Sequence, residues 1–202
     1  MILAFDTSSA ACTAALFDES GACVARSDEL IGRGHSERLV PMLAEMLDGR
    51  TATRILVGVG PGSFTGIRVG IAAGHGLAIG WDAELCGMSS LALLGASAEH
   101  EGEVAAAVIG GHGELFVQQF SRALDPTSEI VNLAPPAAAA ATRAALVVGS
   151  GARQLVDARG WGEARELWPS AANAFTLPHG LHGLPAKPVY ARAPDARVQD
   201  AA

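Results

Sequence analysis

The segment GPGSFTGIRVG, residues 60–70, constrains the fold of this chain more than any other, because it joins an apolar run to a helical pattern. The apolar run covers residues 55–59, so we expect a strand, a tight turn and a helix. Pro61 fixes its own φ, Gly62 can adopt backbone conformations closed to other residues, and Ser63 can cap the first helical turn. The sequence therefore predicts a strand-to-helix connection at this point.

Two interpretations of this turn stay open. A glycine beside a helix N-terminus lets phosphate or carboxylate oxygens reach backbone N–H groups. Glycine and a capping serine also occur in such turns for geometry alone, and the segment lacks the Lys that follows the last glycine of a Walker phosphate loop. An anion at Gly62 and Ser63 is therefore the secondary interpretation.

The composition indicates a globular protein that does not hold nucleic acid through its own charge. Half of the 202 residues are apolar, which is enough for a large core. The net charge of −7 opposes phosphate contacts, which need clustered Lys and Arg. Cys12, Cys23 and Cys86 are odd in number and form no C-x-x-C pair, so neither a disulfide framework nor a cysteine zinc site is indicated.

No leader and no membrane segment is indicated either. The apolar start, residues 1–5, is interrupted by Asp6 and lacks a basic region, and other apolar stretches end before about 18 residues. We therefore expect a cytoplasmic protein that has no membrane partner.

The first half of the chain predicts an α/β unit. Three antiparallel strands are expected first, separated by turns rich in Asp and Ser, at residues 2–5, 12–17 and 23–27. Helices and strands then alternate: a helix at 35–48, a strand at 55–59, a helix at 63–80, a strand at 84–87 and a helix at 89–98. This order predicts a mixed sheet flanked by helices, and we assign residues 1–98 to a first domain.

The second half repeats this pattern more faintly, so we assign residues 99–202 to a second, smaller domain. Its expected elements are a hairpin of residues 104–109 and 115–120, an alanine-rich helix within 134–145 and a strand at 145–149. From Pro169 onward, prolines interrupt every pattern, and we expect the tail to lie across the surface.

The helix after the opening segment carries a row of glycines on one face. Gly66, Gly70 and Gly74, with Ala78, lie four residues apart. Each glycine costs about 1 kcal/mol relative to alanine in a helix interior, so the row needs a reason. Close approach of another backbone is such a reason, and the neighbour is either the sheet of the same domain or a helix of another subunit.

Five segments together resemble the TsaB family, also called YeaZ: ILAFDTS at residues 2–8, HSE at 35–37, GPGSFTGIRVG, SSL at 89–91 and PVYAR at 188–192. They run in order through the chain, and GPGSFTGIRVG is highly specific. The resemblance implies two domains of the actin, hexokinase and Hsp70 (ASKHA) type.

The resemblance also implies a role in forming N6-threonylcarbamoyladenosine beside the tRNA anticodon. In that pathway a threonylcarbamoyl group passes from its adenylate to a tRNA adenosine. TsaB-like proteins are the non-catalytic partners of the paralogous catalytic subunit TsaD, and the ATPase TsaE joins them. The resemblance thus implies a scaffold that meets tRNA only through the complex.

A partner surface is implied on the first two helices, because in these families they pack against the corresponding helices of the partner. In this chain they are the helices expected at 35–48 and 63–80. The same surface would form a homodimer when the partner is absent. The interface residues implied are Leu39, Leu43, Met46, Leu47, Gly66, Gly70 and Gly74.

The chain departs from its relatives at the metal and nucleotide sites. TsaD-like proteins carry an H-x-x-x-H metal motif where this chain reads GMSSLALL at 87–94, and Ser and Leu are poor ligands for iron or zinc. Asp6, Gly149 and Gly151 resemble a weak remnant of a nucleotide site, but residues 110–112, Gly-Gly-His, replace a common Asp-Ala-Arg. We expect no metal, no cofactor and no catalytic residues.

An enzyme is the alternative function: a small-molecule kinase or ATPase of the same fold class. The missing acid at Gly110 opposes it. A metallopeptidase has less support, because the histidines form neither H-x-x-x-H nor H-E-x-x-H.

Overall fold

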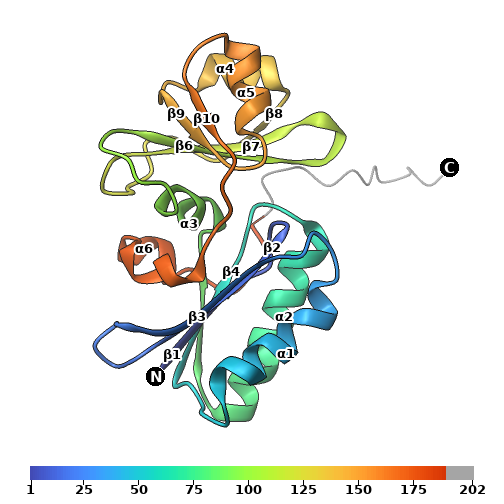
Figure 1. Cartoon of the computed structure of the whole chain (residues 1–202), viewed down its shortest axis with the longest axis vertical. Coiled ribbons are helices and arrows are strands. Elements are labelled where there is room, and N and C mark those ends of the chain that lie inside the picture. Colours follow the sequence, from blue (N-terminus) through green and yellow to red (C-terminus); the bar gives the residue numbers. More distant parts are fainter. Residues whose placement is uncertain (190–202) are drawn as a thin grey trace, which may run out of the picture.

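The computed structural model describes residues 1–189, which form two five-stranded sheets, one above the other along the long axis of the molecule (Figure 1). Residues 190–192 of the motif PVYAR lie outside the described part. No helix within residues 1–189 is long and apolar enough to cross a membrane.

The first sheet has the strand order β3-β2-β1-β4-β5, in which the first three strands are antiparallel and β4 and β5 run parallel to β1. Two helices cover its outer face through an apolar core (Figure 1). The elements are β1 (Ile2–Asp6), β2 (Ala11–Phe17), β3 (Cys23–Leu30), α1 (His35–Leu47), β4 (Arg54–Gly58), α2 (Phe64–Trp81) and β5 (Glu84–Met88).

The second sheet repeats this arrangement, with the order β8-β7-β6-β9-β10 and with α4 and α5 on its outer face. The elements are β6 (Val104–Ile109), η1 (Gly111–Gly113), β7 (Leu115–Phe120), β8 (Val131–Leu133), α4 (Pro135–Ala141), β9 (Leu146–Val148), α5 (Ala152–Arg159) and β10 (Glu163–Arg165). The predicted arrangement of mixed sheets flanked by helices is confirmed.

Three short elements fill the space between the two sheets: α3 (Ser90–Ala96), η2 (Ala171–Thr176) and α6 (His179–His182). One apolar cluster joins them to both sheets. Burial on both faces explains why β1 reads as a nearly continuous apolar run rather than as an alternating strand.

The expectation that the chain lies across the surface from Pro169 onward is wrong for residues 171–174, and its part beyond residue 189 lies outside the described residues. Ala171 and Ala174 are fully buried, and the Ala171 N–H donates a hydrogen bond of 2.8 Å to Thr13 Oγ1 in the first sheet. Prolines interrupt helices here, but the small apolar residues between them fill the space beneath the sheet. The domain boundary at 98/99 stays a prediction; residues 104–165 contain the second sheet, and later residues return to the first.

Three elements of the second unit were not expected: β8, α5 and β10. The two strands have only three residues each, too few to show a period of two. Helix α5 buries only Ala152 and Leu155, so its sequence lacks a clear apolar stripe. Their positions follow from the strand order that the second sheet shares with the first, and not from the pattern of apolar residues in these segments.

The ends of the first two helices are capped differently. Ser63 caps α2 as predicted, because its Oγ accepts a hydrogen bond of 3.2 Å from the Gly66 N–H. Helix α1 is preceded instead by Gly34 at φ 89°, and the Ser36 hydroxyl donates to the Glu37 carboxylate.

The glycine row on α2 faces the sheet of its own unit. A Cβ at Gly66 would lie 1.9 Å from the Thr7 carbonyl oxygen, and one at Gly70 would lie 2.6 Å from Thr7 Oγ1. A Cβ at Gly74 would approach Leu85 at 3.1 Å. The neighbour of this glycine row in the structure is therefore the sheet of the same unit, one of the two neighbours expected from the sequence.

This packing predicts opposite effects for two glycines of α2. Gly66→Ala should destabilise the fold by about 1–3 kcal/mol, because the added methyl meets backbone that cannot move away. Gly76→Ala should stabilise it by up to about 1 kcal/mol, because nothing lies within 4 Å of the new Cβ and alanine favours helix. Denaturant unfolding of the two variants measures both, and equal effects would contradict the assignment.

Candidate functional site in the Asp6 turn and the outer helix pair

The Asp6 carboxylate is fully buried at the end of β1, and the protein itself supplies its hydrogen bonds. Its Oδ1 accepts from the backbone N–H and from the hydroxyl of Ser8, each at 2.7 Å, and its Oδ2 accepts from the Ser90 hydroxyl at 2.5 Å. Three hydrogen bonds to the carboxyl group offset much of the cost of burying it. The oxygens that would face a nucleotide-bound cation are therefore already engaged.

The N-terminus of α2 is also occupied. The Ser63 N–H donates to the Ser8 carbonyl oxygen at 2.6 Å, and the Gly66 N–H is taken by the Ser63 hydroxyl. A Cβ at Gly62 would lie 2.2 Å from the same Ser8 oxygen, so the Asp6 turn lies directly on this helix end. These contacts favour the geometric role of the GPGS turn over anion binding.

Gly149 and Gly151 serve the packing of β9 against β6. Gly149 has φ 112°, and a Cβ there would lie 2.4 Å from the Ala107 carbonyl oxygen. The Gly151 N–H donates to that same oxygen at 3.0 Å. The nucleotide role of these glycines and of Asp6 stays a proposal, and their contacts give each of them a structural function.

The tip of the β6–β7 hairpin contains residues 110–112, of which Gly111 and His112 are exposed. His112 adopts φ 59°, and the Gly110 N–H closes the tip by donating to the Glu114 carbonyl oxygen at 2.7 Å. Within residues 1–189, no three His, Cys, Asp or Glu side chains are grouped so that they could hold a metal ion.

The leucines predicted at the partner interface lie in the core of the protein instead. Leu39, Leu43 and Leu47 are 1%, 3% and 5% exposed, and Met46 is half-buried. Together with the inward-facing Gly66, Gly70 and Gly74, the three leucines leave no surface for direct contact with another subunit. The apolar stripe of an amphipathic helix faces its own sheet first, which accounts for this burial, and the predicted interface role of these residues stays a proposal.

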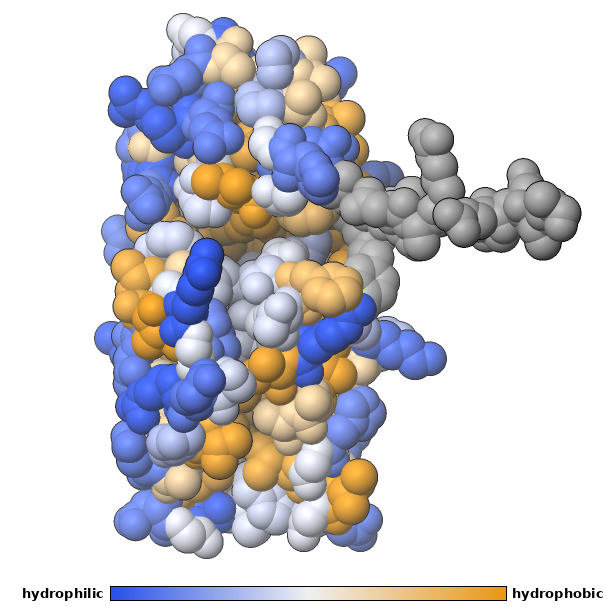
Figure 2. Space-filling view, turned by 90° about the vertical axis from the view of Figure 1, so that its right-hand side faces the viewer, coloured by the Kyte–Doolittle hydropathy of each residue, from blue (hydrophilic) through white to orange (hydrophobic). Residues whose placement is uncertain are grey.

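The outer faces of α1 and α2 present a different set of residues. Val40 is 61% exposed and Ile79 is 84% exposed. Ala72, Gly76 and Gly80, also four residues apart, form a second row of small residues on the solvent side of α2, and the two glycines have open space at Cβ. Figure 2 shows apolar side chains on the lower half of this side of the molecule. We call Val40, Ala72, Gly76, Ile79 and Gly80 the outer face.

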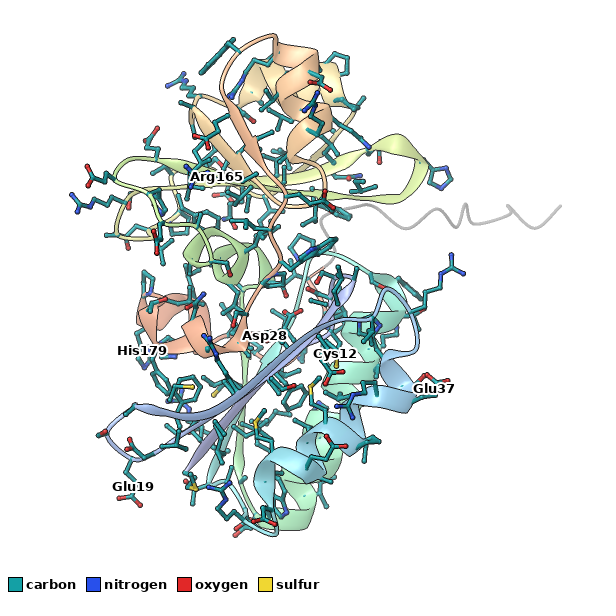
Figure 3. The ribbon with its side chains drawn as sticks, in the orientation of Figure 1. Cys12, Glu19, Asp28, Glu37, Arg165 and His179 are labelled. Atoms are coloured by element: carbon teal, nitrogen blue, oxygen red, sulfur yellow. The ribbon has the colours of Figure 1, made fainter. Side chains whose placement is uncertain are left out.

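Charged residues fix α1 to the sheet beside this surface. Arg38 reaches Glu29 of β3 at 2.6 Å and Glu45 of its own helix at 3.2 Å. The hydrogen bond from Arg38 lowers the pKa of Glu29 below its usual range. Glu37 points outward from α1 (Figure 3).

Cys12 lies in the core covered by α1 (Figure 3). Burial raises the pKa of its thiol to about 11, so the thiol is protonated at neutral pH and is a poor nucleophile.

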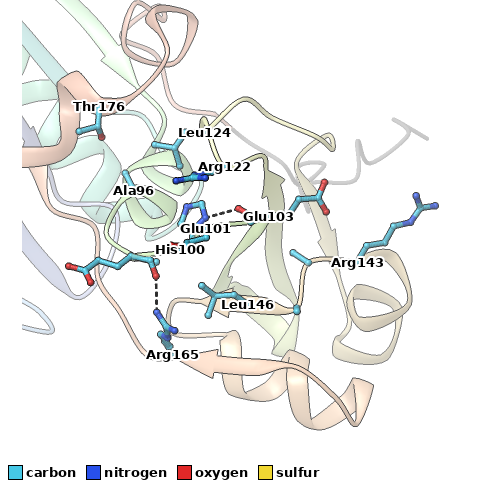
Figure 4. A pocket seen from close by; sticks show the side chains of 15 residues that line it. Ala96, His100, Glu101, Glu103, Arg122, Leu124, Arg143, Leu146, Arg165 and Thr176 are labelled. Carbon is cyan, nitrogen blue, oxygen red and sulfur yellow. Dashed lines mark hydrogen bonds between the residues drawn. The ribbon is translucent and has the colours of Figure 1, made fainter.

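An open groove of about 1,030 Å³ lies elsewhere, between the loop after α3 and the second sheet (Figure 4). Arg165 donates to the Glu99 carbonyl oxygen at 3.1 Å on one wall, and His100 contacts the Gly102 carbonyl oxygen. The groove contains none of the predicted site residues.

Sequence comparison gives a matching family model and matches to curated proteins. The sequence model of the TsaD family, described as tRNA N6-adenosine threonylcarbamoyltransferase, matches residues 28–156. A segment of 129 residues is 36% identical to the Escherichia coli protein described as "tRNA threonylcarbamoyladenosine biosynthesis protein TsaB". That segment covers 60% of this chain and 55% of the E. coli protein, so the match spans about half the length of this curated relative.

Structural comparison extends the similarity along nearly the whole chain. A crystal structure of a protein described as similar to peptidase YeaZ, from Pseudomonas aeruginosa, is 30% identical and has a TM-score of 0.80. The match covers 95% of this chain and 99% of that one. The chain belongs to the TsaB (YeaZ) family. A second P. aeruginosa structure, of YeaZ, has a TM-score of 0.78 and 29% identity over 94% of this chain and 98% of that one.

Sequence reasoning missed two features of this site. Ser90 was noted in the family motif SSL and as a residue in place of a metal ligand, but not as the partner of Asp6, whose carboxylate accepts from its hydroxyl. The row Ala72, Gly76 and Gly80 has the same spacing as the row from Gly66 to Gly74, and only the structure shows which row faces outward. The repeat of small residues was therefore visible in the sequence, but its spacing left open which neighbour each row meets.

The occupied Asp6 carboxylate predicts that ATP with Mg²⁺ leaves the stability of the isolated chain unchanged. A ligand that binds the folded state stabilises it by an amount that rises with the logarithm of its concentration over Kd, and about 2.7 kcal/mol requires a hundredfold excess over Kd. Thermal unfolding with and without millimolar MgATP is the measurement, with MgCl₂ alone as control. A clear rise in Tm that Asp6→Asn abolishes would contradict this prediction.

Proposed function

We propose that this protein is a scaffolding subunit for a TsaD-like catalytic subunit in the formation of N6-threonylcarbamoyladenosine in tRNA. The observation that carries the proposal is the outer face of α1 and α2: exposed Val40 and Ile79 beside glycines with open space at Cβ. Exposed glycine in a helix costs about 1 kcal/mol without a packing partner, and close contact with another helix would offset this cost. The named E. coli relative supports the pathway.

We further propose that the subunit itself is not catalytic. The Asp6 oxygens are engaged by Ser8 and Ser90, and the first helical turn of α2 is capped by protein groups. The thiol most deeply buried, Cys12, is protonated because its pKa is raised. None of these groups is available to a substrate, and this weighs against the alternative of a small-molecule kinase or ATPase.

The same outer face would join two copies of the chain when the catalytic subunit is absent. A stable interface needs about 1,000 Å² of total buried area, which two paired helices on each side can supply. Contact with tRNA, and with a TsaE-like ATPase, would then occur only within the larger complex. The net charge of −7 supports an indirect role toward tRNA.

Reconstitution tests the proposed function. Threonylcarbamoylation of tRNA by the cognate TsaD-like subunit is measured with and without this chain, all other components being equal. We expect the modification to depend on the chain and the chain alone to modify nothing. Unimpaired modification in its absence would contradict the central proposal.

Substitutions on the outer face test where the partner binds. Val40→Glu and Ile79→Glu should each weaken binding to the TsaD-like subunit by about 30-fold, equivalent to about 2 kcal/mol, the cost of a lost interface anchor. Both residues are exposed, so folding should be unaffected. Val24→Glu is the matched control, because Val24 is 49% exposed on β3, away from the helix pair. Titration calorimetry gives the affinities, and equal affinity for all three variants would exclude this face.

A further inference from the structure

The Asp6 turn holds two helices that serve different parts of the molecule. On one side, Asp6 Oδ2 accepts from the Ser90 hydroxyl at the start of α3. On the other side, the turn grips the start of α2, since the Thr7 hydroxyl donates to the Gly66 carbonyl oxygen at 2.7 Å and the Ser8 carbonyl oxygen accepts from the Ser63 N–H at 2.6 Å. A single buried turn thus links α2 to α3.

Ser90 also holds the loop that leads into α2. Its Oγ accepts from the Gly60 N–H at 3.0 Å, and its own N–H donates to the Gly60 carbonyl oxygen at 3.3 Å. Ser90 is 3% exposed, so water cannot replace these bonds. The hydroxyl therefore connects the end of β1 with the turn before α2.

The backbone around these hydrogen bonds is packed too closely to admit a side chain. A Cβ at Gly58 would lie 1.8 Å from Asp6 Oδ2, and one at Gly66 would lie 1.9 Å from the Thr7 carbonyl oxygen. Backbone on both sides is in direct contact with the turn. A shift of Asp6 or Thr7 must consequently move the first turn of α2.

Helix α3 belongs to the core between the sheets. Leu91, Leu93 and Leu94 are buried in the cluster that contains Val104 and Phe120 of the second sheet. The hydrogen bonds of Ser90 and Asp6 therefore connect the start of α2 to a helix that packs against the second sheet. Helix α2 itself lies on the far face of the first sheet.

We propose that Asp6 and Ser90 are positioning residues for the outer face of α2, which they orient for the catalytic partner. The inference rests on the proposed function for the identity of the partner. The orientation of α2 itself can be tested in the isolated chain.

The test compares the full chain with its Ser90→Ala variant by two measurements. Hydrogen exchange at the amides of the first turn of α2 should become about 10-fold faster, and affinity for the TsaD-like subunit should fall about 10-fold, because the variant lacks the two buried hydrogen bonds of the Ser90 hydroxyl. Both are measured where circular dichroism shows the same helix content as in the parent chain.

Ser97→Ala is the matched control at the other end of α3. The Ser97 hydroxyl donates to the Leu93 carbonyl oxygen and accepts from the Ser170 N–H, and it has no contact with the Asp6 turn. This variant should leave exchange in α2 and partner affinity unchanged. Equal effects of the two substitutions would overturn the positioning role, because they would reflect general loosening of α3.

Asp6→Asn provides a second variant, which keeps the shape of the side chain and removes its charge. If Ser90→Ala does not fold, faster exchange at the start of α2 in Asp6→Asn supports the proposal, and parental exchange overturns it. If the parent chain does not bind the TsaD-like subunit, the proposed function fails. Exchange in α2 still decides whether Ser90 and Asp6 orient this helix.

Discussion

The arrangement at the centre of this protein depends on the burial of one carboxylate. Asp6 lies at the end of a strand covered on both faces, where an unpaired charge would cost several kcal/mol. The chain satisfies it with Ser8 and Ser90, and those bonds require the 60–63 turn and the start of α3 to meet at one point. The glycines around that point follow from the same requirement, because side chains there would overlap the turn.

In this arrangement Asp6 has a structural function. Its carboxyl oxygens accept three hydrogen bonds from serine hydroxyls and a backbone N–H. The surface proposed for the partner lies on the opposite side of α2. The helix is lined with small residues on both faces: Gly66, Gly70 and Gly74 inward, and Ala72, Gly76 and Gly80 outward.

Local pattern predicted the first unit well, because its elements are long and strongly apolar. The strand-turn-helix at residues 55–80 and the cap at Ser63 appear in the structure as expected. The second unit was harder, since β8 and β10 have three residues each and α5 has little apolar surface. The site was harder still to predict. The period of four along α2 does not indicate which row faces the sheet. The hydrogen bond between Asp6 and Ser90 joins residues 84 positions apart, which local pattern does not show.

The return of the chain to its first sheet has a consequence for how this protein folds. Leu184 pairs with Gly87, and the Val189 N–H donates to the Val59 carbonyl oxygen at 2.9 Å. Contacts so distant in sequence slow folding, because a long loop must close before they form. During synthesis on the ribosome, one face of the first sheet lacks its contacts with the C-terminal segment until nearly 190 residues have been made. The unit that is synthesised first is therefore among the last to be completed.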